Sequence, residues 1–254
     1  MAGNTVASKI ALNDVCKTFF ARNAASEVIK HVSIEVKENE FFVLLGPGQC
    51  GKTVLLNIIA GMEVASSGEI LIDGRPNSSS PDVGVVFQRV ALMPWQTVLE
   101  NVGFGPRMEG VAKSQWREKA GHYIQLVGLE GFENAYPHQL SGGMKQRVGI
   151  ARAYCTDADI LLMDEPFGQL DAQTRYQMQN EILRMWEQER RTVVFVTNNI
   201  EEAVYLGDRI VVLSACPATV RQIYSPKLAR PRDYMDEQFL SLRAAITADT
   251  DLAL

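Results

Sequence analysis

The residues with the clearest chemistry form a glycine-rich segment suited to surround a phosphate group. It reads, in order, Gly46, Pro47, Gly48, Gln49, Cys50, Gly51, Lys52 and Thr53. This order fits the pattern GxxxxGK(S/T), in which backbone N–H groups cradle phosphate oxygens. We expect Lys52 to reach the β- and γ-phosphates of a nucleotide and the Thr53 hydroxyl to bind Mg²⁺. The alternative is a chance glycine-rich turn, but an apolar strand-like run precedes the segment and a helix-like run follows it, as the pattern requires.

A second segment ends in two acids. Residues 160–163 form an apolar run of strand length, and Asp164 and Glu165 follow it directly. Carboxylate oxygens suit Mg²⁺, and a carboxylate beside a water molecule can act as a general base. We therefore expect Asp164 to hold Mg²⁺ through water and Glu165 to polarise an attacking water. On its own such a pair would be an ordinary strand end with solvated carboxylates, and its combination with the phosphate loop favours a hydrolytic site.

The segments around these residues alternate between strand and helix. Residues 10–19 and 28–36 alternate apolar and polar side chains and predict strands with one solvated face. Residues 41–45 predict a buried parallel strand, and apolar residues at helical spacing between about 96 and 139 predict an inserted helical subdomain. Further strand and helix candidates are residues 54–60, 68–72, 83–87, 172–187, 192–196, 200–206 and 210–213. This alternation predicts an α/β fold with a mostly parallel sheet.

Composition limits the classes of protein to which the chain can belong. Its 254 residues are 46% hydrophobic, which permits a sizeable core, and its net charge of −5 argues against a basic nucleic-acid surface. The amino-terminal stretch lacks the features of a signal peptide, and no apolar run approaches the roughly 20 residues that span a bilayer. We therefore expect a protein that does not itself cross a membrane. The scattered cysteines predict neither a zinc site nor a disulfide framework; they are Cys16, Cys50, Cys155 and Cys216.

Residues 140–147 read LSGGMKQR and carry the most specific family signal. LSGG followed by a polar and basic helix start, between a phosphate loop and an acidic strand end, resembles the ATP-binding cassette family, and the similarity extends over residues 10–246. The resemblance implies a P-loop NTPase core, an N-terminal antiparallel β subdomain and an inserted α-helical signature subdomain. As one nucleotide-binding domain, residues 1–254 would divide into a core (1–95 and 155–224), a helical subdomain (about 96–154) and a C-terminal tail (225–254).

The resemblance also implies roles for residues outside the phosphate loop. In the family, the LSGG segment of one subunit closes on ATP held by another, so two cassettes must meet head to tail. This role would fall to the signature residues Ser141, Gly142, Gly143 and Gln146. Phe19 matches the aromatic that stacks on adenine, Gln88 the glutamine that contacts magnesium and senses the γ-phosphate, and Asp171 the aspartate at the dimer seam. For Phe19 the competing interpretation is packing at a strand end, and for Gln88 a surface glutamine.

Trp95 lies in a segment that, in the family, links the nucleotide site to a groove for a short helix of the membrane subunit. We interpret Trp95 as an ordinary core residue, because an isolated aromatic is more often buried than functional. The amphipathic stretch around residues 239–246 is expected to pack on the domain.

Three short segments narrow the resemblance to importers of nitrate, sulfonate, taurine and bicarbonate: residues 94–95, 165–168 and 230–232. A member of that group is an ATPase that uses ATP and Mg²⁺ and lies peripherally on the cytoplasmic face of the inner membrane. Its partners would be permease subunits, a second cassette and, indirectly, an extracytoplasmic substrate-binding protein, with no nucleic acid. A homodimer is the simpler expectation and a heterodimer with an orthodox cassette the alternative. The solute is expected to be a small anion.

Four positions depart from the family's usual residues. Asn198 and Asn199 stand where the family usually has His-Asp, and Asn198 cannot carry charge or relay a proton. Gln49 would be strained by about 1 kcal/mol if its φ is positive. Val54 cannot donate a hydrogen bond to the α-phosphate, a bond worth about 0.5–1.5 kcal/mol net. We hypothesise that the protein binds MgATP and dimerises but hydrolyses ATP slowly. A degenerate cassette with a regulatory role is the alternative.

Overall fold

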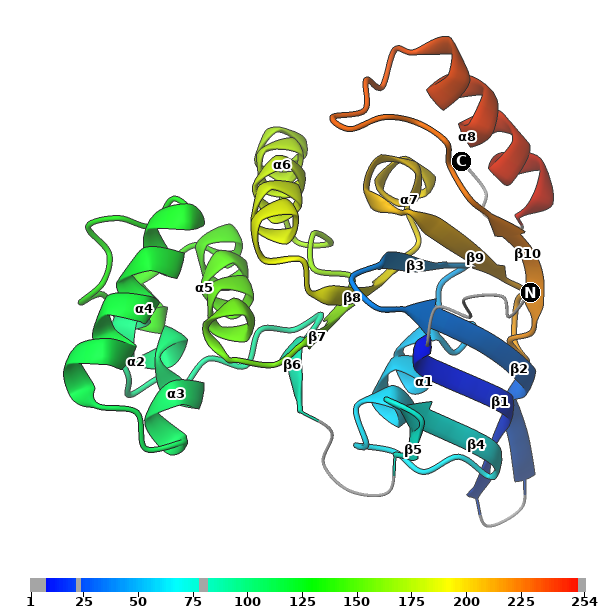
Figure 1. Cartoon of the computed structure of the whole chain (residues 1–254), viewed down its shortest axis with the longest axis horizontal. Coiled ribbons are helices and arrows are strands. Elements are labelled where there is room, and N and C mark those ends of the chain that lie inside the picture. Colours follow the sequence, from blue (N-terminus) through cyan, green and yellow to red (C-terminus); the bar gives the residue numbers. More distant parts are fainter. Residues whose placement is uncertain (1–7, 22–23, 78–81, 251–254) are drawn as a thin grey trace, which may run out of the picture. The chain divides into compact units, whose positions relative to one another are not determined.

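The computed structural model describes residues 8–21, 24–77 and 82–250 (Figure 1). The chain divides into two compact units, of which the first contains residues 1–81 and 191–254 and the second residues 82–190. The amino-terminal stretch, whose sequence does not have the features of a signal peptide, lies partly outside the described residues. Within the described ranges no helix combines the length and the apolar character needed to cross a bilayer.

An antiparallel sheet forms one layer of the first unit. Its strand order is β2-β1-β4-β5, with β1 (Ser8–Ala21) and β2 (Ala24–Lys37) as long neighbouring strands. The shorter strands are β4 (Ser67–Ile72) and β5 (Arg75–Pro76). The ladder between β1 and β4 contains a bulge, where a Cβ on Gly68 would lie 2.3 Å from the Asp14 carbonyl oxygen. Only glycine fits this close approach of two backbones. The predicted N-terminal antiparallel subdomain is confirmed.

A mostly parallel sheet forms the second layer of this unit. Its strands run in the order β10-β9-β3-β8, and β3 (Phe41–Leu45) is parallel to both β8 (Thr192–Thr197) and β9 (Arg209–Leu213). All residues of β3 and β8 are buried, as strands covered on both faces require. The antiparallel β10 (Val220–Tyr224) forms the edge. The unit's helices are α1 (Lys52–Ile59), α7 (Ile200–Leu206) and α8 (Glu237–Asp249).

The second unit combines two parallel strands with most of the helices. Strand β6 (Val83–Val86) pairs with β7 (Ile160–Asp164), which is buried throughout. The helices are α2 (Val98–Val102), α3 (Phe104–Met108), α4 (Lys113–Leu126), the 3₁₀ turn η1 (Pro137–Gln139), α5 (Gly142–Cys155) and α6 (Ala172–Glu189). Helices α2 to α5 fall where the sequence predicted the inserted helical subdomain. The compact unit also takes in β6, β7 and α6. The α/β fold class is confirmed.

Candidate functional site

The glycine-rich loop joins the end of β3 to the start of α1 in the first unit. Helix α1 begins at Lys52, and Gly51 before it has φ +116°. A Cβ on Gly51 would lie 3.0 Å from both the Cγ1 and the carbonyl oxygen of Val28, so the backbone there admits only glycine comfortably. The loop therefore delivers its backbone N–H groups to the amino end of a helix, where the helix dipole favours an anion.

The Lys52 ammonium lies within the curve of this loop. The side chain is only 4% exposed, and Nζ donates to the carbonyl oxygens of Gly46 at 2.8 Å and Pro47 at 2.7 Å. Cys50 is also buried, and burial raises the pKa of its thiol. A buried thiol with a raised pKa is a poor nucleophile, so Cys50 acts as a small loop residue. The positive charge in the loop thus belongs to Lys52.

Gln49 adopts the left-handed conformation on which its predicted strain depends. Its φ is +62°, a region that side chains other than those of Asn and Asp rarely enter. The expected cost is about 1 kcal/mol relative to glycine. Val54 follows the exposed Thr53 in the first turn of α1, where it presents no donor. Two of the four sequence departures, Gln49 and Val54, therefore lie in the backbone cradle itself.

Asn198 directly follows strand β8, at the edge of the sheet where the glycine-rich loop begins. Thr197, the last residue of β8, is the partner of Leu45, the last residue of β3, in the parallel ladder. Parallel strands end at the same edge, so Gly46 and Asn198 start out from adjacent positions. The Asn198 residue is exposed, whereas Thr197 is buried. An amide group is thus placed at the edge where the phosphate loop begins.

Asn199 has a structural role that asparagine can fill as well as the aspartate that the family usually has at this position. It is the N-cap of α7, and its Oδ1 accepts from the backbone N–H of Glu202 at 3.1 Å. The Thr197 hydroxyl donates to Glu202 Oε2 at 2.6 Å and accepts from the backbone N–H of Asn199 at 3.0 Å. Asparagine caps helices as well as aspartate does. The second family departure therefore preserves the turn, and only Asn198 changes its chemistry.

Phe19 sits near the end of β1 with an exposed ring. It is 40% exposed, and the Lys17 ammonium lies 4.7 Å from the ring centroid. Lys17 is itself held by the Glu63 carboxylate at 2.7 Å and the Val64 carbonyl at 2.6 Å. The adjacent Phe20 is 81% exposed and was not singled out in the sequence. Successive side chains of a strand point to opposite faces, so each of these rings offers a separate aromatic surface on which a base could stack.

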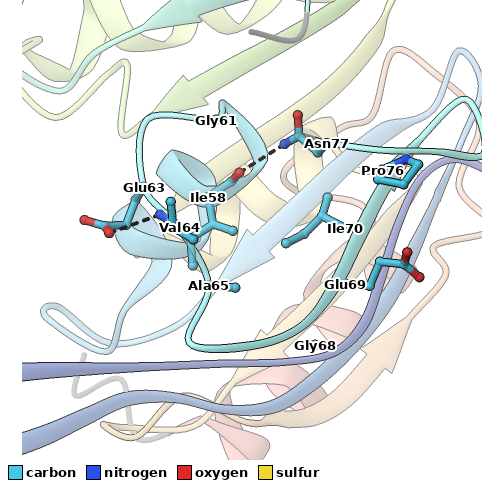
Figure 2. Close-up of a pocket in the computed structure, with 10 residues that line it drawn as sticks. All are labelled: Ile58, Gly61, Glu63, Val64, Ala65, Gly68, Glu69, Ile70, Pro76 and Asn77. Atoms are coloured by element: carbon cyan, nitrogen blue, oxygen red, sulfur yellow. Dashed lines mark hydrogen bonds between the residues drawn. The ribbon is translucent and has the colours of Figure 1, made fainter. Parts of the chain in front are cut away.

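A groove of about 280 Å³ lies at the opposite end of α1 from the glycine-rich loop (Figure 2). Asn77 Nδ2 donates to the Ile58 carbonyl there, and the wall includes the carboxylates of Glu63 and Glu69. The negative end of a helix disfavours phosphate, and the Glu69 carboxylate adds charge of the same sign, while Glu63 is paired with Lys17. This groove is therefore not a nucleotide site.

In the second unit, Gln88 and Glu165 form a direct hydrogen bond. Val86 and Met163 are partners in the parallel ladder of β6 and β7, so the residues that follow both strands share one edge. Gln88 Nε2 donates to Glu165 Oε2 at 3.0 Å. Glu165 has φ +43°, a strained conformation for a glutamate, and Asp164 before it is 5% exposed. Strain of this kind persists where the surrounding structure holds it and is common at functional sites.

Ser141 caps the amino end of α5. Its Oγ accepts from the backbone N–H of Met144 at 3.3 Å, and Ser141 and Gly142 are exposed. The first turn of this helix thus presents a hydroxyl and backbone N–H groups, which together suit an anion. A Cβ on Gly143 would lie 3.2 Å from Leu170 Cδ2, so glycine also permits close packing there.

Gln146 lies on the inward side of the same helix, contrary to its expected contact with nucleotide. It is 1% exposed, and neither amide atom has a hydrogen-bond partner among the described residues. The helical period turns residue 146 away from the exposed start of α5. A direct contact with nucleotide is therefore not available to this side chain in the structure.

Asp171 caps the next helix, α6. Its Oδ1 accepts from the backbone N–H of Thr174 at 3.0 Å, and this backbone bond is the main cause that holds the pKa of the exposed Asp171 carboxyl below its ordinary value. The residue expected at a dimer seam thus also fixes where α6 begins.

Trp95 is not a core residue, which corrects the sequence interpretation. Its side chain is 74% exposed. The loop that carries it is held from inside by Asn101, which is fully buried on α2 and accepts from the Met93 N–H at 2.8 Å. Asn101 Nδ2 also donates to the carbonyls of Met93, Gln96 and Thr97 at 3.2, 3.0 and 3.0 Å. Sequence reasoning missed Asn101, although a lone amide in the run Val-Leu-Glu-Asn-Val was the available signal.

Comparison with known proteins agrees with this arrangement. A family model described as ABC transporter matches residues 29–168. An uncharacterized ABC transporter ATP-binding protein of Methanocaldococcus jannaschii is 48% identical over 239 residues, which cover 94% of this chain and 90% of that protein. An aliphatic sulfonates import ATP-binding protein of Bacillus cereus is 40% identical over 238 residues, with 93% and 94% covered.

Solved structures show the same fold. A bacterial ABC transporter cassette solved as a dimer has a TM-score of 0.78 at 32% identity, with 88% of this chain and 99% of that chain covered. A dimeric post-hydrolysis state of that cassette, bound to ADP and Pi, gives a TM-score of 0.77 at 30% identity, with the same shares covered.

Proposed function

The chain belongs to the ABC transporter family, and from this premise we propose that it is the ATP-hydrolysing subunit of an importer for a small anionic solute. The observation that carries the ATPase proposal is the pairing of Leu45 with Thr197, which sets Asn198 beside the phosphate loop. The Gln88–Glu165 bond in the second unit supports it. The importer part is supported by the relatives that are named as sulfonate import proteins.

The first unit holds the nucleotide. Backbone N–H groups of the loop and the amino end of α1 bind the triphosphate, and Phe19 stacks on the adenine. Lys52 exchanges its bonds to the Gly46 and Pro47 carbonyls for the β- and γ-phosphates. Thr53 in the first unit, and Gln88 and Asp164 in the second, carry oxygen ligands of the kind that would hold Mg²⁺, which would supply positive charge against the phosphates.

Glu165 takes the proton of the attacking water. An ionised carboxylate is an acceptor only, and the Gln88 amide, which donates to Oε2 at 3.0 Å, orients it. Asn198 contributes a neutral N–H donor toward the γ-phosphate. Because it carries no charge and relays no proton, it stabilises the developing negative charge less than a histidine would.

Ser141 and the first turn of α5 close on ATP held by a second cassette, in a head-to-tail dimer. The exposure of Ser141 and Gly142 and the dimeric state of the similar solved cassette support this step. We favour a homodimer. The exposed Trp95 belongs to the surface that meets the permease subunits, so the protein lies peripherally on the cytoplasmic face of the membrane.

A second candidate function is a slow, regulatory cassette in which ATP occupancy gates the complex. Gln49 at φ +62°, Val54 and Asn198 favour it, since they weaken the cradle and the charge around the γ-phosphate.

Purified full-length protein tests the proposal through Glu165→Gln. We expect MgATP turnover to fall by about 100-fold or more, since proton transfer is lost, while MgATP binding persists. This variant should dimerise with MgATP in light-scattering chromatography, and Ser141→Arg should abolish the dimer. Glu187→Gln, an exposed glutamate on α6, is the matched control and should behave as wild type. Absence of MgATP binding, or a monomer in every state, would contradict the proposed ATPase.

Membrane association tests the importer part separately. The protein should sediment with membranes of its host and be released by alkaline carbonate without detergent. Trp95→Ala should shift it to the soluble fraction.

A further inference from the structure

The carboxyl end of α7 is occupied by two arginines from the tail. Arg232 is 6% exposed, and its Nη1 donates to the carbonyls of Val204, Tyr205 and Gly207. Arg230 donates through Nη2 to the Leu206 carbonyl and through Nη1 to Asp208. The last carbonyls of a helix lack partners within the helix, and cations are favourable there. Two guanidinium groups thus fix this end of α7.

The tail also contacts α7 near its carboxyl end, at Tyr205, and at its start, at Glu201. The ring of Tyr234 stacks on that of Tyr205, with centroids 4.6 Å apart and planes 6° apart. Arg243, on α8, donates to Glu201 Oε1 at 2.6 Å. Figure 1 shows α8 alongside α7, and the buried Phe239 of α8 packs against Tyr234 at 5.1 Å. The tail therefore holds α7 at both of its ends.

The first turn of α7 is bonded in turn to the loop that carries Asn198. Glu202 accepts from the Thr197 hydroxyl, and its N–H donates to Asn199. Glu201, which binds Arg243, is the neighbour of Glu202 and lies three positions after Asn198. A shift of α7 would therefore move both residues that flank Asn198.

We propose that residues 230–249 form a C-terminal brace that fixes α7 and, through it, the position of Asn198, with Arg243 as the positioning residue at the start of the helix. The role assigned to Asn198 rests on the proposed function. The mechanical coupling of the brace to residues 197–203 does not depend on the proposed function, so the coupling and the catalytic role of Asn198 can be tested separately.

Hydrogen exchange of the full-length protein without nucleotide tests the coupling. Arg243→Ala should speed exchange of the amides of residues 199–203 by about two- to fivefold, the factor expected for one partly exposed ion pair. Arg232→Lys, which keeps the charge but cannot span three carbonyls, should speed exchange at residues 203–207 by about tenfold. Amides of β3 should exchange as in wild type. Lys30→Ala, which breaks the exposed Lys30–Glu27 pair in the same unit, is the matched control and should change nothing in α7.

ATP turnover then tests positioning. Arg243→Ala should lower kcat by about two- to fivefold with KM unchanged, and Arg243→Glu combined with Glu201→Arg should restore it. In an Asn198→Ala background, Arg243→Ala should have no further effect on kcat. Unchanged exchange at residues 199–203, acceleration spread over the whole unit, or an undiminished effect in the Asn198→Ala background would overturn the brace. If the wild type hydrolyses no ATP but the exchange pattern holds, the proposed function fails and the brace stands.

Discussion

Leu45 and Thr197 are partners in the parallel ladder between β3 and β8, and each is the last residue of its strand. The phosphate loop follows one and Asn198 follows the other. The register of a buried ladder is strongly fixed, because a slip by one residue would turn every side chain to the opposite face. The sheet itself therefore sets Asn198 at the edge of the phosphate loop, and the residue type at position 198 decides what that position contributes.

Asn198→His should raise turnover. An imidazole at this position can carry charge and relay a proton, and we expect kcat to rise about tenfold, which corresponds to about 1.4 kcal/mol of barrier. Steady-state hydrolysis of MgATP gives the measurement. Asn199→Asp is the matched control, since it restores the neighbouring family residue but keeps the same N-cap, and it should leave kcat unchanged. An Asn198→His protein with wild-type kcat would refute a limiting role for Asn198.

Gln49→Gly should stabilise the protein. Glycine enters the left-handed region without the steric cost that glutamine bears at φ +62°, and we expect a gain of about 1 kcal/mol in the free energy of unfolding. Affinity for MgATP should rise as well, because glycine lets the backbone of the loop adjust its N–H groups to the phosphates. Denaturant unfolding and calorimetric titration measure the two effects.

The control for Gln49 is another residue of similar backbone geometry. Asn39 has φ +58°, but asparagine tolerates this region. Asn39→Gly should therefore yield a smaller gain and no change in MgATP affinity. An equal gain at both positions would show that Gln49 is not specially strained.

The sequence predicted those helices and strands in which the pattern of apolar residues reflects which side chains are buried. Residues 172–187 were expected as a helix and α6 spans Ala172–Glu189, and the apolar run at residues 41–45 coincides with β3. The edge strand β10 was not predicted, because Val220–Tyr224 is mostly exposed and has no apolar run. Helix α3 lies within the predicted helical subdomain, but its bounds were not predicted, since Gly105 and Pro106 within it are poor helix formers.

For the site, motif spacing located the phosphate loop and the acidic strand end but not the directions of side chains. Trp95 was expected inside and is exposed, because Asn101 holds its loop by bonds that composition cannot reveal. Gln146 was expected to contact the nucleotide but is buried. The helical period places its side chain on the inward face of α5, which the motif spacing did not reveal.

Glu40→Gln should stabilise the protein at neutral pH. Burial is the main cause that raises the pKa of Glu40 above its ordinary value, despite its bonds to the Lys37 N–H and to Arg209. A raised carboxyl pKa means that ionisation opposes folding. The ionised form therefore costs stability at pH above the folded pKa, and this cost disappears as the pH falls toward the unfolded value.

The difference in melting temperature between Glu40→Gln and wild type should be largest at neutral pH and vanish below about pH 4. Glu38→Gln, at an exposed position two residues away, supplies the control and should show no pH-dependent gap. If the difference in melting temperature between Glu40→Gln and wild type stays constant with pH, the titration of this carboxyl does not cause it.

Asn101→Ala should release the loop that carries Trp95. The side chain is fully buried, its Oδ1 accepts from the Met93 N–H, and the two hydrogens of Nδ2 are shared among three carbonyls. Its removal deprives the Met93 N–H and the Gln96 carbonyl of these partners, whereas the Met93 and Thr97 carbonyls keep a backbone N–H each. At about 0.5–1.5 kcal/mol for each of three bonds, one accepted by Oδ1 and one for each hydrogen of Nδ2, the free energy of unfolding should fall by about 1.5–4.5 kcal/mol. Gln115→Ala, an exposed amide on α4, should change it by less than about 0.5 kcal/mol. The mobility of the loop is measured by the fluorescence anisotropy of Trp95. Because Trp116 and Trp186 also fluoresce, both are first replaced by phenylalanine. In that background Asn101→Ala should lower the anisotropy of Trp95, and an unchanged value would show that Asn101 does not hold the loop.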